Sequence, residues 1–490
     1  MLLLIVLLVP VVPAVATAAF GWRKLAIVTQ LVSAVVLVVL AALLAVRVLA
    51  DTTLHFGGAA LRADALGAFM VLVVAAVGLL AVWSAIGYID TELAHGHTSA
   101  AGARLFGSLL PLFVATMLLA LLAGNAAVSW VAIEGTTITT VFLVGHRRSR
   151  ASLEASWKYV IIGSVGIALA FLGTIVLAYA TRAAGVPSAD ALNWATLTTV
   201  GGRLDPATAR LAGGLLLLGY GTKIGLVPMH TWLPDAHSQA PAPVSALMSG
   251  VLLAVAFSVF LRLKVVIDAA AGPNYLRGLL IAAALLSLGV AASLMIGQRD
   301  AKRLLAYSSI EHMGVVAFAA AIGTPLAIAA LLLHIVAHAL GKSVAFLAIG
   351  ELPELEGTSR IAELRGLLTR RPVLGGCFAL AIIGLLGFPP FGLFASELAV
   401  ARAGLDANLG WQTAAIFTVL LVASAALLYQ AQLLLLGASD NKPIRASAAK
   451  APRATLLLPL VGGLVAFAVL GVTVWPIERL LNAAARVITG

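Results

Sequence analysis

Cysteine and charge are both scarce in this chain of 490 residues. The only cysteine is Cys377, so no disulfide can form within the chain, and no cysteine cluster can hold zinc or an iron–sulfur centre. Charged residues make up 10% of the sequence and apolar residues 62%, and no stretch has the composition of a separate soluble domain. Any redox cofactor (iron–sulfur, nickel–iron, flavin or quinone) is therefore expected on a partner protein and not in this chain.

Long apolar runs recur along nearly the whole length, and the mean hydropathy is +1.08. A helix of about 20 apolar residues crosses the hydrocarbon core of a bilayer. Alternating ten-residue strands are absent, which favours helices over a barrel. The first run, 1–20, lacks a charged segment before it and is followed at once by another run, so we interpret it as a helix of the mature protein and not a signal peptide. The sequence predicts an all-α polytopic membrane protein.

We expect about fourteen transmembrane helices. Their approximate ranges are 1–20, 25–49, 64–89, 106–124, 126–145, 156–180, 208–229, 243–263, 277–297, 303–323, 325–350, 373–396, 411–436 and 454–477.

The distribution of Lys and Arg predicts the orientation. These residues are more numerous on the side that carries the loops 21–24, 146–158, 299–303, 360–371 and 442–453. The richer side is expected to be cytoplasmic, which places both termini outside, in the inner (plasma) membrane of a bacterium or archaeon. The net charge of +11 is explained by this topology and by anionic lipid in the bilayer, and no nucleic-acid partner is expected.

Two of the expected spans contain prolines at mid-membrane. Pro228 and Pro234 follow Lys223 in GYGTKIGLVPMHTWLPDAHSQAPAPVSA, and Pro389 and Pro390 lie in IGLLGFPPFGLFASE. Because proline removes a backbone donor and clashes with the preceding turn, helices seven and twelve should be broken there. Freed carbonyls and helix ends at such breaks form ligand or water sites.

The two breaks are five spans apart, and paired interruptions of this kind indicate inverted repeats. We predict four segments: helices one to three in 1–100, a first antiporter-like repeat of helices four to eight in 105–265, a second repeat of helices nine to thirteen in 275–437, and helix fourteen in 450–490.

Ionisable residues inside apolar runs are the strongest functional signal. They are Glu134, Lys223, Lys342 and Glu397. A charge at the bilayer centre costs roughly 2.5 to 3.5 kcal/mol, so it is rarely kept without a use. Glu134 has a structural interpretation, capping by the neighbouring threonines, but an ion pair with Lys223 on another helix is favoured because its making and breaking can move a proton.

Three titratable residues follow one another on a single helix face. His334, His338 and Lys342 are spaced i, i+4 and i+8, which is the spacing of a proton relay. Zinc binding by the two histidines is disfavoured, because the HExxH pattern is absent and Lys342 would repel the metal.

Further polar residues extend this pattern more weakly. Glu311 and His312 in AYSSIEHMG can link the row of His334, His338 and Lys342 to either side of the membrane. His230 and His237 flank the broken span seven, where a solvated loop is the alternative to a path for protons. Glu397 can also be read as a carboxylate favoured by the dipole of the helix that follows the proline pair.

Several segments, in their order and spacing, resemble the proton-translocating antiporter-like subunits of respiratory complex I and its relatives. They are WVAIEGTTITTVFLVG, LEASWKYVIIGSVG, GYGTKIGLVPMHTWLPDAHSQAPAPVSALMSGVLL, KRLLAYSSIEHMG and GFPPFGLFASE. Within that family the chain most resembles the F-type membrane subunit of hydrogenase-4 and formate hydrogenlyase complexes. The resemblance spans roughly residues 105 to 400.

The resemblance implies roles for individual residues. Glu134 and Lys223 match the coupled pair thought to gate proton uptake, and Lys342 matches the central lysine of the second half. Glu397 matches the residue of broken helix twelve that passes the proton outward. The implied partners are other membrane subunits and a hydrophilic redox arm.

Three other functions remain open from the sequence. The chain can be a cation/proton antiporter module that moves sodium, the membrane subunit of an inorganic-carbon uptake complex, or a non-conducting scaffold in which the charges only hold helices together.

Overall fold

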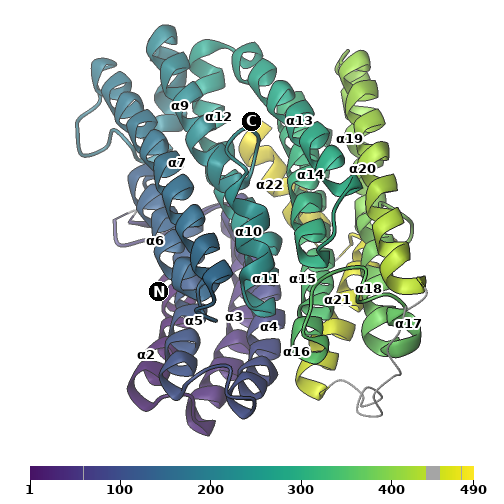
Figure 1. The fold of residues 1–490 in the computed structure, drawn as a ribbon. Helices are drawn as coiled ribbons and strands as arrows, with labels where there is room; N and C mark the ends of the chain where they lie inside the picture. Colours follow the sequence, from purple (N-terminus) through teal and green to yellow (C-terminus); the bar gives the residue numbers. More distant parts are fainter. Residues whose placement is uncertain (59, 438–452, 476, 490) are drawn as a thin grey trace.

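The computed structural model describes residues 1–58, 60–437, 453–475 and 477–489. Helices dominate these residues and lie side by side in one bundle (Figure 1). Within these ranges, twelve helical spans are long and apolar enough to cross a membrane. The predicted all-α membrane fold is therefore confirmed.

In chain order, the first half contains α1 (Leu2–Leu8), α2 (Val11–Phe20), α3 (Lys24–Asp51), β1 (Leu54–Phe56), β2 (Leu61–Ala63), α4 (Ala65–Ala94), α5 (Ala100–Leu122), α6 (Ala126–Val144), α7 (Arg150–Ala183), α8 (Trp194–Val200), the 3₁₀ turn η1 (Gly201–Arg203), α9 (Pro206–Ile224), α10 (Trp232–Gln239), α11 (Ala242–Leu247), the π-helical turn η2 (Met248–Leu252) and α12 (Leu253–Ala271). The second half contains α13 (Pro273–Ile296), α14 (Ala301–Ile322), α15 (Pro325–Gly350), α16 (Leu352–Glu356), α17 (Leu367–Arg370), α18 (Pro372–Leu385), α19 (Gly392–Asp406), α20 (Gly410–Leu436), α21 (Ala454–Val472) and α22 (Glu478–Thr489).

Both proline-containing spans are divided into two helices. In the first, α9 ends at Ile224, and Gly225 continues in the left-handed conformation with φ of 86°, which a residue with a Cβ rarely adopts. In the second, α18 ends at Leu385 and α19 begins at Gly392. The intervening residues include Pro228 in the first break and the Pro389–Pro390 pair in the second.

Pro234 does not break a helix, contrary to the prediction. It occupies the first turn of α10, which begins at Trp232. Proline is tolerated there because the first N–H groups of a helix have no intrahelical acceptor.

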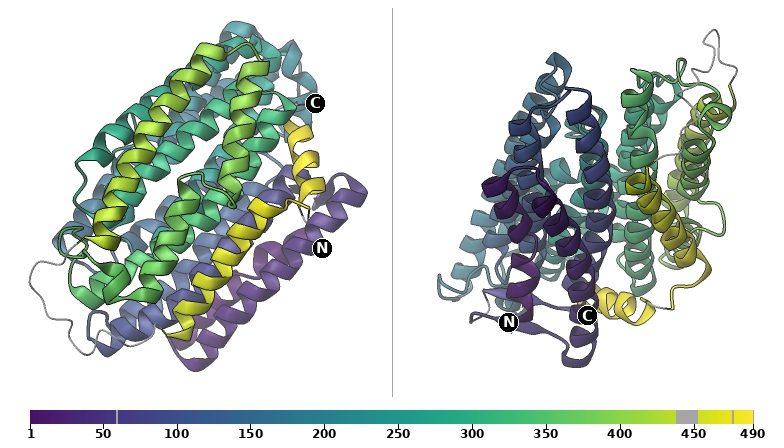
Figure 2. Two further views of the ribbon diagram at one scale, coloured as in Figure 1. Left: turned by 90° about the vertical axis from the view of Figure 1, so that its right-hand side faces the viewer. Right: turned by 90° about the horizontal axis from the view of Figure 1, so that it is seen from below.

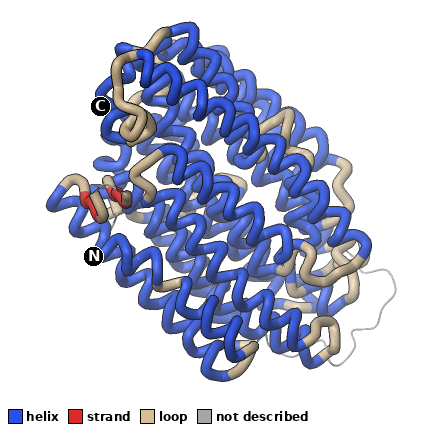
Figure 3. Tube along the Cα trace, turned by 90° about the vertical axis from the view of Figure 1, so that its left-hand side faces the viewer, coloured by secondary structure: helices blue, strands red, loops and turns tan. Residues whose placement is uncertain are grey.

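The structure adds two elements at one end of the bundle that the sequence did not predict. Strands β1 and β2 form a short antiparallel hairpin, which lies on the same side as both chain ends (Figure 3). The C-terminal segment holds α22 in addition to the expected spanning helix α21. Most of the predicted loop 442–453 falls outside the described residues.

The innermost spans are Ala242–Ala271, α14 and α15. The most apolar 18-residue windows of Ala242–Ala271 and α15 are fully buried. Around α15 pack α11, α14, α18, α19 and α21. Helix α21 reaches back from the second half to pack on α4 of the first half (Figure 2). Polar side chains on α14 and α15 therefore face other helices and not lipid.

Candidate functional site

Lys223 lies in the last turn of α9, directly before the break, and is 1% exposed. Its Nζ donates hydrogen bonds to Thr137 Oγ1 on α6 and to Tyr159 Oη on α7, both at 2.7 Å. The ammonium also lies 4.6 Å from the centre of the Tyr159 ring. Three helices thus place hydroxyl and aromatic groups around one lysine, which makes a buried cation tolerable.

Glu134 reaches this lysine through Thr137 and not directly. Glu134 Oε2 accepts a hydrogen bond of 3.0 Å from Thr137 Oγ1, one turn further along α6. Among the described residues no ion pair joins Glu134 to Lys223, so the predicted direct contact is replaced by a bridge. The physical reason is the i, i+3 spacing of Glu134 and Thr137, which puts the hydroxyl between carboxylate and ammonium.

Aromatic side chains connect the Lys223 cluster to His237 on α10. The Tyr159 and Trp232 rings are 4.9 Å apart, and the Trp232 and His237 rings are 6.0 Å apart. His237 then packs on Phe346 of α15, with ring centroids 5.8 Å apart. His237 is fully buried and its two ring nitrogens have no hydrogen-bond partner in the described protein. It therefore lies between the first lysine and the helix that carries the second.

Lys342 is fully buried at the centre of α15. Its Nζ donates to the Leu305 carbonyl of α14 at 2.9 Å, and the same carbonyl accepts a hydrogen bond from Ser309 Oγ at 3.1 Å. Glu311, also on α14, is 1% exposed, and its Oε2 has no hydrogen-bond partner among the described groups. The bundle interior thus holds a lysine and a carboxylate on adjacent helices.

Three histidines continue from Lys342 toward α19. His312 Nδ1 lies 3.2 Å from His334 Nε2, and His334 Nδ1 lies 3.0 Å from Ser396 Oγ. The His338 ring is 5.0 Å from the His312 ring, centroid to centroid. All three histidines are fully buried. The hydrogen-bonded series His312, His334, Ser396 spans α14, α15 and α19, and neutral imidazoles can pass a proton along such a series.

Glu397 follows Ser396 on α19, in the half-helix after the second break. Its side chain is partly buried, and its carboxylate packs on Gly387, where a Cβ would lie only 2.4 Å from Oε2. Gly387 has φ of 70°, and the absence of a side chain makes room for the carboxylate. The break therefore provides the space in which Glu397 lies.

A π-helical turn, η2, lies within the buried span that follows α10. Ser249 in this turn shares a hydrogen bond of 2.7 Å with Ser309 of α14, which ties η2 to the carbonyl that Lys342 contacts. At Gly250 a Cβ would come within 2.9 Å of Ser343 Oγ on α15. Such turns recur at functional sites because they re-aim side chains.

Some polar residues around the first break have buried atoms without a partner, and others form ion pairs or hydrogen bonds. His230 lies in the connection between α9 and α10, is partly buried, and has an unpartnered Nδ1. Asp235 instead forms ion pairs with Lys158, at 2.9 Å, and with Arg303. Lys302 lies in the basic loop 299–303, but it is 4% exposed and donates to the Ala240 carbonyl at 2.5 Å.

Among the described residues no group of three or more His, Cys, Asp or Glu side chains is placed to hold an ion.

The sequence reasoning missed the hydroxyl groups that connect the charged residues. The sequence indicates Thr137 only as one of the threonines that can cap Glu134, and it does not single out Tyr159, Ser309 or Ser396. Each is a polar residue inside an apolar span, such as Tyr159 in the WKY segment and Ser396 in the FASE segment. A polar residue in that position is the sequence feature that could have identified them.

Comparison with known proteins identifies the family of this chain. A sequence profile described as NADH:quinone oxidoreductase/Mrp antiporter, transmembrane, matches residues 123–423. The hydrogenase-4 component F homolog of Methylacidiphilum infernorum is 41% identical over 339 residues, 69% of this chain and 71% of that protein. NADH-quinone oxidoreductase subunit N of Deinococcus radiodurans is 34% identical over 345 residues, 69% and 67% of the two chains. The chain belongs to the NADH:quinone oxidoreductase/Mrp antiporter family.

Solved structures show the same fold. A chain of the membrane-bound sulfane sulfur reductase, an archaeal respiratory membrane complex, superposes with a TM-score of 0.88 at 22% identity, covering 99% of this chain and 97% of its own. A chain of the Mrp complex from Dietzia sp. DQ12-45-1b gives a TM-score of 0.84 at 20% identity, with full coverage of both chains.

Proposed function

We propose that this protein moves protons across the membrane as one subunit of a redox-driven complex of the hydrogenase-4 or NADH:quinone oxidoreductase type. The observation that carries the proposal is the file of buried titratable side chains that begins at Lys223 and reaches Ser396 beside Glu397. Burying so many ionisable side chains in a membrane protein costs free energy, so such groups are rarely kept unless they serve ion movement.

The proposed transfer starts at the Thr137 bridge. Loss of negative charge at Glu134, or its movement away from Thr137, favours release of a proton from the Lys223 ammonium, which becomes a neutral amine. The proton passes by way of His237 to Lys342, then through His338, His312 and His334 to the Glu397 carboxylate. Glu397 becomes a neutral acid and releases the proton outward.

Electrostatic coupling can drive these steps without large movement. A unit charge acting over about 10 Å at an effective dielectric constant near 20 changes the energy of a second charge by roughly 1.7 kcal/mol. That is more than a tenfold change in a protonation equilibrium. A redox reaction in a partner subunit that changes one charge near Glu134 can therefore change the protonation of the titratable side chains from Lys223 to Glu397.

The electron carriers are proposed to lie on partner subunits. Two relatives support this assembly by their names, a hydrogenase-4 component and a subunit of NADH-quinone oxidoreductase. The proposed location is the cell membrane of a bacterium or archaeon, with both termini outside. It is supported by the Lys and Arg distribution and by the position of both chain ends on one side of the bundle (Figure 3).

Sodium/proton antiport is the second candidate, because the matching family includes Mrp antiporters. Inverted membrane vesicles that contain the native assembly separate the two functions. If the protein is a redox-driven proton pump, the electron donor will acidify the vesicles whether or not sodium is present. A sodium pulse that moves protons without donor, and donor oxidation that moves none, would establish antiport instead.

The Thr137 bridge gives a sharper test of the first transfer step. In Thr137→Val the hydroxyl between Glu134 and Lys223 is lost, and we expect donor-driven acidification to slow roughly tenfold, because a hydrogen bond to a charged group contributes about 1.5 to 3 kcal/mol. Thr137→Ser keeps the hydroxyl and should pump at close to the wild-type rate. Equal rates in the valine and serine variants would show that the bridge has no part in transfer.

A further inference from the structure

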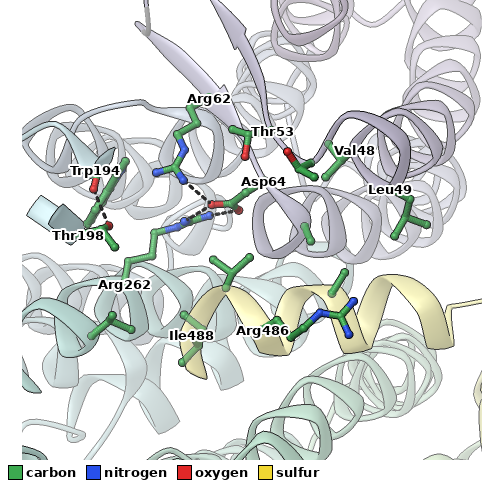
Figure 4. A pocket seen from close by; sticks show the side chains of 15 residues that line it. Val48, Leu49, Thr53, Arg62, Asp64, Trp194, Thr198, Arg262, Arg486 and Ile488 are labelled. Atoms are coloured by element: carbon green, nitrogen blue, oxygen red, sulfur yellow. Dashed lines mark hydrogen bonds and ion pairs between the residues drawn. The ribbon is translucent and has the colours of Figure 1, made fainter. Parts of the chain in front are cut away.

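A second polar site lies far from the charged file, at the end of the bundle that carries the hairpin. It is a cavity of about 440 Å³ between the end of α3, strand β2, the start of α4, and helix α22. Three arginines line it: Arg62 of β2, Arg262 of α12 and Arg486 of α22. Figure 4 shows Arg62 and Arg262 converging on Asp64 from two sides, with α22 along another edge.

Positive charge exceeds negative charge in this cavity. Asp64 forms two hydrogen bonds of 2.6 Å with Arg262 and an ion pair of 3.4 Å with Arg62. Burial alone would raise the pKa of Asp64, but Arg262 and Arg62 hold it well below its usual range. Asp64 thus stays ionised and neutralises one of the two arginines, while Arg486 forms no ion pair with any described residue.

Donor groups remain available in the cavity. Arg62 Nε is buried and has no acceptor among the described residues. Thr53 also lines the cavity, whereas the hydroxyl groups of Thr52 and Thr198 donate to the carbonyls of Asp51 and Trp194. Guanidinium donors suit the oxygens of a phosphate group.

The cavity lies at the level where lipid headgroups are expected. The spanning helix α3 ends at Asp51 and α4 begins at Ala65, so the cavity is expected where hydrocarbon gives way to headgroups. Trp475, between α21 and α22, is 79% exposed, as is typical of aromatic residues at a membrane interface.

One wall of the cavity is apolar. Val48 and Leu49 of α3 and Val487 and Ile488 of α22 line it, and α22 buries Leu480 and Leu481 while exposing Arg479. This combination of apolar wall and cationic donors fits an amphiphile better than a free ion.

We propose that this cavity binds the headgroup of an anionic phospholipid, with the phosphate among Arg62, Arg262 and Arg486 and the glycerol and upper acyl chain against Leu49 and Val487. The site is separate from the proton path and does not depend on it. A bound lipid would fasten α22 to the hairpin and to the start of α4.

The full-length protein, purified in detergent, tests the proposal by native mass spectrometry with added phosphatidylglycerol or phosphatidylcholine. We expect the wild type to retain phosphatidylglycerol preferentially. Arg486→Gln should weaken that binding roughly fivefold, since one arginine near anionic lipid contributes about 1 kcal/mol. The matched control is Arg479→Gln, about two turns earlier on the same helix, which is also exposed but does not line the cavity and should bind as the wild type does.

Two further measurements distinguish a loss of lipid binding from a loss of folding. Equal thermal unfolding of the wild type and Arg486→Gln in phosphatidylcholine micelles shows that the variant folds, and Arg486→Lys should recover part of the binding. Equal retention of both lipids, or equal loss in the two glutamine variants, would overturn the proposal. Complete displacement of phosphatidylglycerol by millimolar inorganic phosphate would also overturn it, in favour of a site for free phosphate.

Discussion

Lys223→Met is expected to abolish donor-driven proton pumping, to below roughly 1% of the wild-type rate, because positioned proton carriers commonly contribute a factor of 10² or more. Methionine has a similar length but cannot carry a proton. The measurement is acidification of inverted vesicles that contain the native assembly, with donor oxidation followed in the same sample.

The same substitution should leave the fold intact. After loss of the ammonium, Thr137 still donates to Glu134, and Tyr159 still shares a hydrogen bond of 2.6 Å with Thr140. Two effects on stability oppose each other. The substitution removes the cost of burying the Lys223 ammonium, but the partly buried Glu134 carboxylate loses the cation beyond Thr137. Thermal unfolding should therefore occur close to the wild-type temperature.

Lys24→Met is the matched control, because Lys24 is exposed at the start of α3. It should pump as the wild type does. Undiminished pumping in Lys223→Met would remove this lysine from the path, and loss of the assembled complex in that variant would favour the scaffold interpretation.

Glu397→Gln is expected to slow pumping by roughly a hundredfold, because the amide cannot accept and release the proton that arrives through His334 and Ser396. Glutamine has the same shape, so the contact with Gly387 is kept. The initial rate of acidification per electron transferred is the quantity to compare.

Asp406→Asn provides the control for Glu397 because it lies on the same helix, α19, and is exposed beside Arg402. Its pumping should be unchanged. If Glu397→Gln pumps at the wild-type rate, the outward step does not use this carboxylate, and its role is to fill the space at Gly387.

The broad architecture follows from local sequence properties. Apolar runs are long enough to identify the spans, and Pro228 and the Pro389–Pro390 pair coincide with the two breaks. Proline alone does not break a helix here, because Pro111 and Pro459 lie inside α5 and α21. Each break also contains a glycine in the left-handed conformation, Gly225 or Gly387, and the sequence does not show that conformation directly.

The connections within the site depend on which helices pack together, and the sequence does not encode this locally. The Thr137 bridge needs α6 beside α9, and the contact between His334 and Ser396 needs α15 beside α19. The spacing of His334, His338 and Lys342 predicted their common face, but not that His312 of α14 would lie between two of them. Helix α22 and the hairpin are too short to stand out from composition alone.

The buried residues from Lys223 to Glu397 are proposed to conduct protons through water and side chains inside the bundle. His237 and His338 carry buried nitrogens with no partner among the described residues, and buried polar groups are almost always hydrogen bonded. A structure of the native assembly in lipid, at a resolution that shows ordered water, tests this most directly. Ordered water molecules should join Lys223 to His237, His237 to Lys342 and His334 to Glu397. A dry, closely packed apolar barrier between Lys223 and Lys342 would contradict it.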